Sequence, residues 1–241
     1  STTNPCPTDN LYRIIGVFED KVKLIKYDYA TSALLGTNGD YYGTSTPSTS
    51  YYKGSLTSVN TYYWNSSDEQ NTWSIALLNT TNLNTNFINN LSTTWSNKLV
   101  TTTWKVGGGL LIDIIRQIPS MSYQNEITTP ASTTTYNAKI GLMYVSDYGF
   151  ATDPSAWTLT LENYNNTTAI NSNWMYIGHD EWTITRDSDG PDSEFRIDKS
   201  GIVSSDLGTY NSNGVRPVFN LESSVTYVSG DGTQSSPIRI N

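Results

Sequence analysis

The sequence predicts an α+β fold built mostly of antiparallel strands, with two short helices. Three observations support this prediction. Residues 21–26 alternate charged and apolar side chains, which is the period of a half-exposed strand. Residues 60–104 place apolar side chains at helical spacing. The last third of the chain holds short β-type segments separated by turns that contain glycine, a pattern typical of antiparallel sheets.

The first expected element is a hairpin. Residues 10–18 are apolar and rich in β-branched residues, Glu19 and Asp20 supply a turn, and residues 21–26 form the second strand. Residues 36–54 contain five Gly and Pro residues among many Ser, Thr and Tyr, which predicts a long ordered loop. Loops of this length in a compact domain tend to be functional. We expect its Tyr-rich part, residues 41–52, to buttress or extend a binding site.

Two helices are expected between residues 60 and 104. The first would be capped by Ser67 or Asp68 and would extend through Trp73 to Leu78. The second carries four apolar residues on one face, namely Leu83, Phe87, Ile88 and Leu91. Thr and Asn, which are abundant here, are poor helix formers, so packing against the rest of the fold must hold both helices.

After residue 102 the pattern becomes β-like again. The three glycines at 107–109 indicate a backbone hinge and lack the spacing of a phosphate-binding loop. Residues 110–118 form an apolar run that fits a strand or a helix. Residues 119–136 are expected to be a polar loop, 138–145 a buried strand and 163–173 a surface segment. Turns are expected at Asp189-Gly190, Ser200-Gly201, Asn213-Gly214 and Asp231-Gly232.

Composition limits the classes of function. The 241 residues carry a net charge of -8, only 15% are charged, and 87 are Ser, Thr or Asn. Seven Trp, 17 Tyr and 5 Phe supply buriable area, so the chain is folded and polar-surfaced, as expected of an extracellular protein. With 14 basic against 22 acidic residues it is not a basic nucleic-acid reader. It has no apolar run of about 18 residues that could cross a membrane.

The single cysteine and the single histidine restrict the chemistry. Cys6 alone excludes an intramolecular disulfide framework and a cysteine-based zinc site. A catalytic triad would have to centre on His179, yet no Gly-x-Ser-x-Gly nucleophile elbow occurs, which favours a satisfied or solvent-facing histidine. Residues 187–194 partly match a calcium loop, but Pro191 occupies a ligand position, so a hairpin turn explains them better. We expect no enzyme activity, no cofactor and no metal.

The most informative stretch is residues 174–217, where an aromatic and glycine framework alternates with irregularly placed charges. Seven of the 22 acidic residues lie between Asp180 and Asp198. This pattern indicates either a solvated hairpin face or a recognition surface with aromatic anchors and adaptable polar groups. We expect a recognition surface. Its expected ligand-binding residues are Tyr176, His179, Asp180, Trp182, Arg186, Asp187, Asp189, Asp192, Glu194, Arg196, Asp198 and Tyr210.

A series of motifs along the chain carries a family resemblance. The motifs are Trp64, Trp73-Ser74, Leu83-Asn84, Phe87, Trp104-Lys-Val-Gly-Gly, Ile140 to Gly149 (Ile-Gly-Leu-Met-Tyr-Val-Ser-Asp-Tyr-Gly), Trp174-Met-Tyr-x-Gly178, Glu181-Trp-Thr-Ile184 and Gly214-Val-Arg-Pro-Val-Phe-Asn-Leu221. The series resembles C-type-lectin-fold domains on surface proteins of gut bacteria. It is distantly similar to formylglycine-generating enzymes and to the variable proteins of diversity-generating retroelements. The likeness covers about residues 10–240, and its closing Gly-Val-Arg-Pro block is the most specific part.

The resemblance implies a C-type lectin fold in one domain, residues 10–241, after a tail of residues 1–9. In retroelement-diversified proteins a reverse transcriptase rewrites codons near the C-terminus, and residues 174–217 occupy the matching place. A bacterial cell-surface location is implied, with a protein or glycan partner. The anchor to the membrane or cell wall, pilin-like or lipoprotein-like, is expected outside this fragment. Trp182 and Arg216 are expected in the framework, with the arginine tying the last strand to carboxylates beneath the variable loops.

Two differences from the related families argue against copper-dependent oxidation and against calcium-dependent sugar binding. A chain with one cysteine lacks the paired cysteines that formylglycine-generating enzymes use with copper. The Glu-Pro-Asn, Gln-Pro-Asp and Trp-Asn-Asp triplets of calcium-dependent sugar-binding lectins do not occur. Two alternatives remain open. One is a lectin or glycan-active enzyme that uses acidic residues of this region, such as Asp187 and Glu194. The other is a structural pilus or surface-layer subunit without a ligand.

Overall fold

The computed structural model describes residues 6–37, 41–42, 47–48, 52–56, 59–64, 70–208, 211–233 and 235–241. As predicted, it combines helix and strand, its sheets are antiparallel and its helices are short. Much of the predicted loop at 36–54 lies outside the described residues, as do the expected helix caps Ser67 and Asp68.

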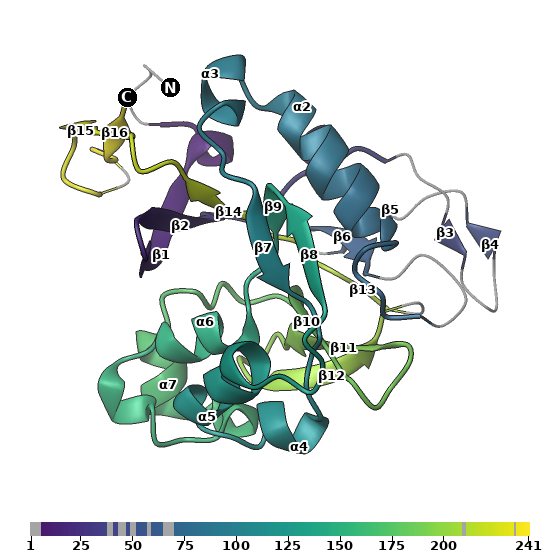
Figure 1. Ribbon diagram of the computed structural model, residues 1–241. Coiled ribbons are helices and arrows are strands. Elements are labelled where there is room, and N and C mark those ends of the chain that lie inside the picture. Colours follow the sequence, from purple (N-terminus) through teal and green to yellow (C-terminus); the bar gives the residue numbers. More distant parts are fainter. Residues whose placement is uncertain are drawn as a thin grey trace.

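The central sheet has four antiparallel strands in the order β1-β2-β14-β9. These strands span Tyr12–Phe18, Lys21–Lys26, Val218–Leu221 and Ile140–Gly141. The predicted hairpin is confirmed as β1 and β2, joined by the turn at Glu19 and Asp20. Strand β14 lies between β2 and β9, so a strand near the C-terminus pairs with one near the N-terminus (Figure 1).

One continuous helical stretch packs beside this sheet (Figure 1). It consists of the π-helical segment η2 (Leu78–Phe87) and the α-helix α2 (Ile88–Asn90), and the short α3 (Thr93–Ser96) follows. The second predicted helix is therefore confirmed, and both Leu83 and Phe87 are fully buried in it.

The first predicted helix is wrong over the described residues. Trp73 lies in a turn of residues 73–75, and helical structure begins only at Leu77. Trp73 is 1% exposed and its ring packs against that of Trp64, with centroids 4.9 Å apart. The apolar spacing that suggested a helix therefore reflects burial of this ring outside a helix.

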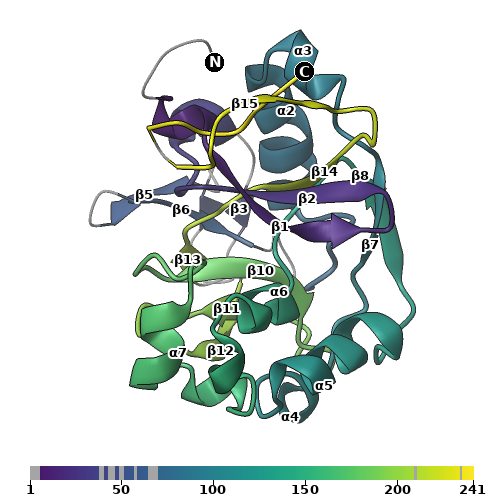
Figure 2. The same cartoon turned by 90° about the vertical axis from the view of Figure 1, so that its left-hand side faces the viewer.

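A second group of elements surrounds a three-stranded antiparallel sheet, β10-β11-β12. These strands span Glu181–Arg186, Ser193–Ile197 and Val203–Leu207. A ribbon of β7 (Thr102–Lys105) and β8 (Thr135–Ala138) runs between the two groups in Figure 1. Figures 1 and 2 both place α4 to α7 at the end of the molecule that holds β10–β12, and α3 and β15 at the opposite end.

More helices are present than the two that were predicted. They are α4 (Leu111–Ile114), α5 (Pro119–Tyr123), the π-helical η3 (Gln124–Thr128), α6 (Val145–Phe150), the 3-10 segments η4 (Pro154–Ala156) and η5 (Leu161–Asn163), and α7 (Thr167–Ser172). The ambiguous run 110–118 is thus helical in part. The predicted loop at 119–136 is wrong in its first half. The strand expected at 138–145 is limited to the end of β8 and to β9, and α6 begins at Val145.

The remaining elements complete the sheets. They are the 3-10 turn η1 (Thr8–Asn10), α1 (Ser32–Leu35), β3 (Tyr41–Tyr42), β4 (Pro47–Ser48), β5 (Tyr52–Leu56), β6 (Val59–Tyr63), β13 (Ser212–Asn213), β15 (Tyr227–Ser229) and β16 (Arg239–Ile240). Strands β13, β6 and β5 form one sheet, and β3-β4 and β15-β16 form pairs. Three of the four predicted turns connect strands, whereas Asn213 belongs to β13 and pairs with Tyr62.

Tryptophan side chains join the two groups of elements. The indole Nε1–H of Trp64 donates to the Thr183 carbonyl at 2.8 Å, and that of Trp182 donates to the Tyr62 carbonyl at 2.7 Å. Both rings are fully buried, so their N–H groups need these partners. Strand β6 is thereby fastened to β10 by two reciprocal bonds over a sequence distance of about 120 residues.

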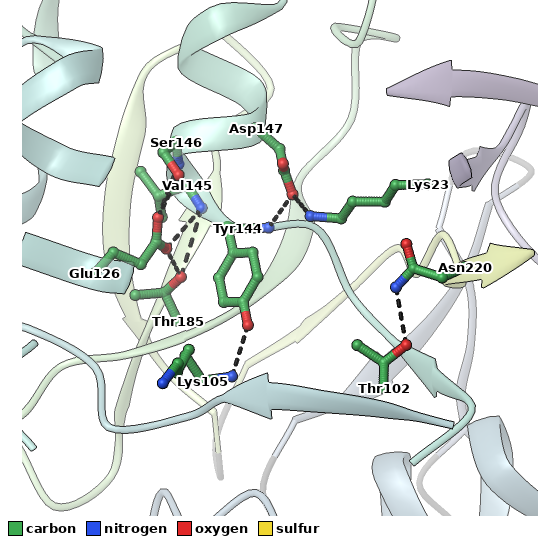
Figure 3. Close-up of polar contacts among 10 residues, drawn as sticks. All are labelled: Lys23, Thr102, Lys105, Glu126, Tyr144, Val145, Ser146, Asp147, Thr185 and Asn220. Carbon is green, nitrogen blue, oxygen red and sulfur yellow. Dashed lines mark hydrogen bonds and ion pairs between the residues drawn. The ribbon is translucent and has the colours of Figure 1, made fainter. Parts of the chain in front are cut away.

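A buried polar network reinforces the same junction (Figure 3). The Lys23 ammonium of β2 lies 2.5 Å from the Asp147 carboxylate of α6, and both side chains are less than 10% exposed. The Glu126 carboxylate accepts hydrogen bonds from the Val145 and Ser146 amides and from Thr185 Oγ1. Burial raises the pKa of Glu126, and these hydrogen bonds oppose that rise. The network fixes the start of α6 against both sheets.

Candidate ligand-binding face

The sheet β10–β12 separates apolar from charged side chains along its central strand. Phe195 and Ile197 are buried against the core, together with Val203 of the neighbouring strand. Glu194 and Arg196 alternate with them and therefore point to the other face. The core-facing residues give this charged face a rigid support.

Arg196 is the centre of a half-exposed group of charges, which we call the Arg196 cluster (Asp180, Arg196, Asp198 and Asp206). The guanidinium lies 2.9 Å from Asp180 Oδ1, 3.1 Å from Asp206 Oδ2 and 3.6 Å from Asp198 Oδ2. The four side chains are 16–33% exposed. Three carboxylates around one guanidinium leave the cluster with a net negative charge that a ligand can reach.

Backbone hydrogen bonds hold these carboxylates in place. Asp180 Oδ1 accepts from the Lys199 amide at 2.9 Å, and Asp198 Oδ1 accepts from the Ser200 amide at 2.6 Å. Burial raises the pKa of Asp198, but the bonds from Ser200 and the positive charge of Arg196 outweigh it, so the pKa lies below the usual value. These bonds therefore hold the Asp180 and Asp198 carboxylates in fixed positions, and the charged form of Asp198 is favoured.

Tyr176 and His179 border the Arg196 cluster. The Tyr176 phenol donates to the Lys199 carbonyl at 2.6 Å. The His179 ring contacts the Tyr29 ring edge to face, with ring centroids 5.7 Å apart. The backbone carbonyl of His179 accepts a hydrogen bond from the Tyr29 phenol. Both predicted residues are half-buried.

Glu194 differs from its neighbours because it has no exposed surface. Neither carboxyl oxygen has a hydrogen-bond partner among the described residues. In register it lies between Arg186 of β10 and Asp206 of β12. Burial raises its pKa well above the usual value, and the charges of Asp192 and Asp206 add to the rise. A side-chain Cβ at Gly208 would come within 2.0 Å of its Oε2, so the backbone there covers the carboxyl group.

Asn71 organises the turn between β10 and β11. Its side-chain amide nitrogen lies 2.7 Å, 2.5 Å and 2.9 Å from the carbonyl oxygens of Asp187, Gly190 and Ser193. Its oxygen accepts from the Arg186 guanidinium at 2.9 Å. One buried amide from a distant part of the chain thus sets the shape of the turn that carries Asp189 and Asp192.

We expect Asn71→Ser to lower the free energy of unfolding by about 1–2 kcal/mol, because buried carbonyls lose their donor. Amide hydrogen exchange in residues 187–193 should accelerate more than elsewhere. The neighbouring exposed residue provides a matched control, Gln70→Ser, which should change neither quantity. Equal exchange rates in the two variants would contradict this role of Asn71.

The structure divides the predicted binding residues into separate sets. Tyr176, His179, Asp180, Arg196 and Asp198 come together at one end of the charged face. Arg186, Asp187, Asp189 and Asp192 gather at the β10–β11 turn, with Asp187 only 8% exposed. Trp182 and Glu194 are fully buried, and Tyr210 lies outside the described residues. Trp182 was expected both in the framework and among the ligand-binding residues; with 0% exposure it lies in the framework and presents no surface to a ligand. The two carboxylates named for a glycan-active enzyme, Asp187 and Glu194, are both buried.

Two residues that shape the charged face were not predicted from the sequence. Asp206 completes the Arg196 cluster. It lies two residues after Ser204, on the same face of β12, and this period-two placement of polar residues is a signal that the sequence did contain. Asn71 lies more than 100 residues from its turn, and no local pattern could have indicated it.

A buried ion pair lies under this face. Arg216 Nε is 2.7 Å from Glu181 Oε1, and its Nη2 donates to the Met175 carbonyl at 2.6 Å. Both side chains are at most 3% exposed. The prediction that Arg216 ties the end of the chain to a carboxylate below the face is confirmed. Gly214 and Val215 bond to Asp180 and Ala30 through the backbone, which fixes the arginine further.

Comparisons with known proteins found no match for this chain among family models, curated proteins or solved structures. Within the described residues, no three His, Cys, Asp or Glu side chains are grouped in a way that could hold a metal ion. The same part of the chain contains no helix with the length and apolar character needed to cross a membrane.

Proposed function

We propose that this chain is a ligand-binding domain that recognises a protein or glycan partner through the Arg196 cluster and its border residues Tyr176, His179 and Lys199. The observation that carries the proposal is a half-exposed, ordered set of charges on a sheet whose other face is buried in the core. Rigid presentation of polar groups next to aromatic rings lowers the ordering cost of binding.

The finer proposal follows from the motif resemblance. The domain has the C-type lectin fold, is displayed on a bacterial cell surface, and belongs with the variable proteins of diversity-generating retroelements. Support comes from the location of the charged face within residues 174–217, between the aromatic start and the Gly-Val-Arg-Pro end. The buried Trp182 and Arg216 would form the constant frame beneath it.

A binding experiment tests the first part of the proposal. The full chain is screened against arrayed glycans and arrayed extracellular proteins, and each binder is measured again with His179→Ala/Lys199→Glu. We expect affinity to fall at least tenfold with an unchanged melting temperature. Lys21→Glu, at the start of β2, is the matched charge control and should bind normally. Binders whose affinity does not fall in the double variant would contradict the proposed role of this face.

A genomic observation tests diversification. The coding segment for residues 174–217 should have a near-copy beside a reverse-transcriptase gene, and the two copies should differ mainly at adenines. The codons of exposed positions such as Asp189 should differ, whereas those of Trp182 and Arg216 should not. A source genome without such a copy would contradict the retroelement assignment and leave the binding proposal standing.

A further inference from the structure

A large open groove extends from Trp174 and Tyr27 to the end of the molecule that holds α3 and β15, and none of its lining residues belongs to the Arg196 cluster. It encloses about 1440 Å³. Its walls come from the start of β1, from α3, and from the C-terminal β15–β16 hairpin, which Figures 1 and 2 show gathered at the top of the molecule. Pockets for single small ligands usually measure about 300–1,000 Å³, so this groove suits an extended ligand.

Aromatic rings line much of the groove. Tyr12, Tyr27, Trp95, Trp174 and Tyr227 all contribute to its surface. Tyr227 is 66% exposed, and the other four are partly buried against the core. The rings of Tyr12 and Trp95 lie 5.6 Å apart and form one continuous wall. Rings held in this way offer flat apolar faces to a ligand at little entropic cost.

The charged side chains of the groove are all of one sign. Arg13 and Arg239 line it, and no Asp or Glu side chain is among its described lining residues, although the chain as a whole is acidic. The Arg13 guanidinium lies over the Tyr27 ring at 4.6 Å and the Trp174 ring at 5.8 Å, and it donates to the Trp174 carbonyl. A guanidinium has five N–H donors, so Arg13 keeps donors for a second partner.

Polar groups complete the lining. Asn10, Ser92, Thr94 and Thr233 place amide and hydroxyl groups around the aromatic wall. An oligosaccharide of acidic sugars matches each part of this surface. The C–H faces of its rings would pack on the aromatic side chains that Arg13 does not cover, namely Tyr12, Trp95 and Tyr227. Its hydroxyl groups would bond to the polar groups, and its carboxylates would pair with the arginines, because guanidinium matches a carboxylate in geometry and charge.

We propose that the groove between β1, α3 and the β15–β16 hairpin is a second binding site, which takes an acidic oligosaccharide of the uronate type. It is separate from the Arg196 cluster and opposite to it in charge. A single domain would thereby hold an acidic glycan at one end and present its recognition face at the other.

The test uses the full chain and uronate hexasaccharides from polygalacturonate, alginate and hyaluronan, with binding measured by calorimetry and by nuclear magnetic resonance titration. The matched ligand control is each hexasaccharide after reduction of its carboxylates to alcohols. We expect at least one uronate to bind at least tenfold more tightly than its reduced form. The perturbed amides should be those of β1, α3 and β15–β16.

Variants locate the site. Tyr227→Ser removes the most exposed ring and Arg13→Gln removes a positive charge, and each should weaken uronate binding at least fivefold. Because Arg13 also packs between two rings, Arg239→Gln provides a second charge variant with the same expectation. The matched control is Arg116→Gln, an equally drastic loss of charge at an exposed position outside the groove, which should bind normally.

Three results of the sugar titrations would overturn the proposal: no uronate binding at millimolar concentration, equal binding of the reduced sugars, or equal weakening by Arg116→Gln. Preferential retention on phosphatidylglycerol vesicles instead of uronates would also overturn it, in favour of a lipid surface. His179→Ala/Lys199→Glu should leave uronate binding unchanged. A failure of the groove proposal can therefore be distinguished from a failure of the proposed function of the Arg196 cluster.

Discussion

Replacing Arg216 with methionine should lower the free energy of unfolding by about 3–5 kcal/mol, the usual cost of removing one partner from a buried ion pair. The variant leaves the Glu181 carboxylate without the guanidinium at 2.7 Å and the Met175 carbonyl without its donor at 2.6 Å. Neither group can turn to solvent, because Glu181 is 2% exposed and Met175 is fully buried.

The loss in Arg216→Met should grow with pH. Burial raises the pKa of Glu181, and the attraction of Arg216 opposes that rise. Without the arginine the folded-state pKa moves further above the unfolded value, so the folded state holds a proton that the unfolded state releases. Stability of the variant therefore falls as pH rises through this interval.

Urea unfolding of both proteins at pH 5 and pH 8 measures this effect, and the melting temperature should drop by about 6–20 °C at neutral pH. Arg116→Met is the matched control, because its side chain is 57% exposed and only 3.8 Å from Glu162 at the surface. It should change stability by less than about 0.5 kcal/mol. Adding Glu181→Gln to Arg216→Met should recover part of the loss. A loss equal to that of the control would show that the pair is not a structural anchor.

Glu194→Gln should stabilise the fold by about 2–4 kcal/mol at pH 8, the cost of keeping an unpaired carboxyl group in the interior. The amide carries no charge, and its N–H groups can donate toward the carboxylates of Asp192 and Asp206. Burial and those charges raise the pKa of Glu194, while the nearby Gly208 backbone amide and the charge of Arg186 oppose the rise.

The sign of the pH dependence follows from the raised folded-state pKa. Below the ordinary glutamate value, both states hold the proton and Glu194 costs nothing. As pH rises toward the raised value, only the unfolded state ionises, and wild-type stability declines. The gain from Glu194→Gln should thus be absent near pH 4 and largest at pH 8. Since Glu126 and Glu181 also have raised pKa values, the difference between the two proteins isolates Glu194.

Unfolding curves from pH 4 to pH 8 provide the measurement, and Glu162→Gln, with a side chain 40% exposed, is the control. A destabilised Glu194→Gln at pH 8, or a gain that does not vary with pH, would show that the carboxyl group has a partner it needs.

Local sequence patterns predicted the helices and strands that are determined by residues close together in the sequence. The alternation in residues 21–26 gave β2, and the glycine turns bounded β11 and β12. The helices at 119–128 were missed because their Ser, Tyr, Asn and Thr residues have weak helix propensity. They exist because Glu126 bonds to the start of α6, a contact that depends on the tertiary fold.

The candidate site shows the same division. The sequence identified the region, and it identified most members of the Arg196 cluster because charges stand out among Ser, Thr and Asn. It could not separate exposed from buried members of the region. Trp182 is covered by β6 and Glu194 by the backbone at Gly208, and both contacts join residues that no local pattern connects. The contacts of Asn71 with the β10–β11 turn could not be predicted for the same reason.

The position of β14 has a consequence for how the chain reaches its native state. Because β14 completes the central sheet by pairing with β2 and β9, that sheet cannot close until residues 218–221 have emerged from the ribosome. Contacts over such a sequence separation make folding slow relative to a helical protein of this size. During that delay β2 has an open edge, and its charged residues Lys21, Lys23 and Lys26 discourage pairing with a neighbouring nascent chain.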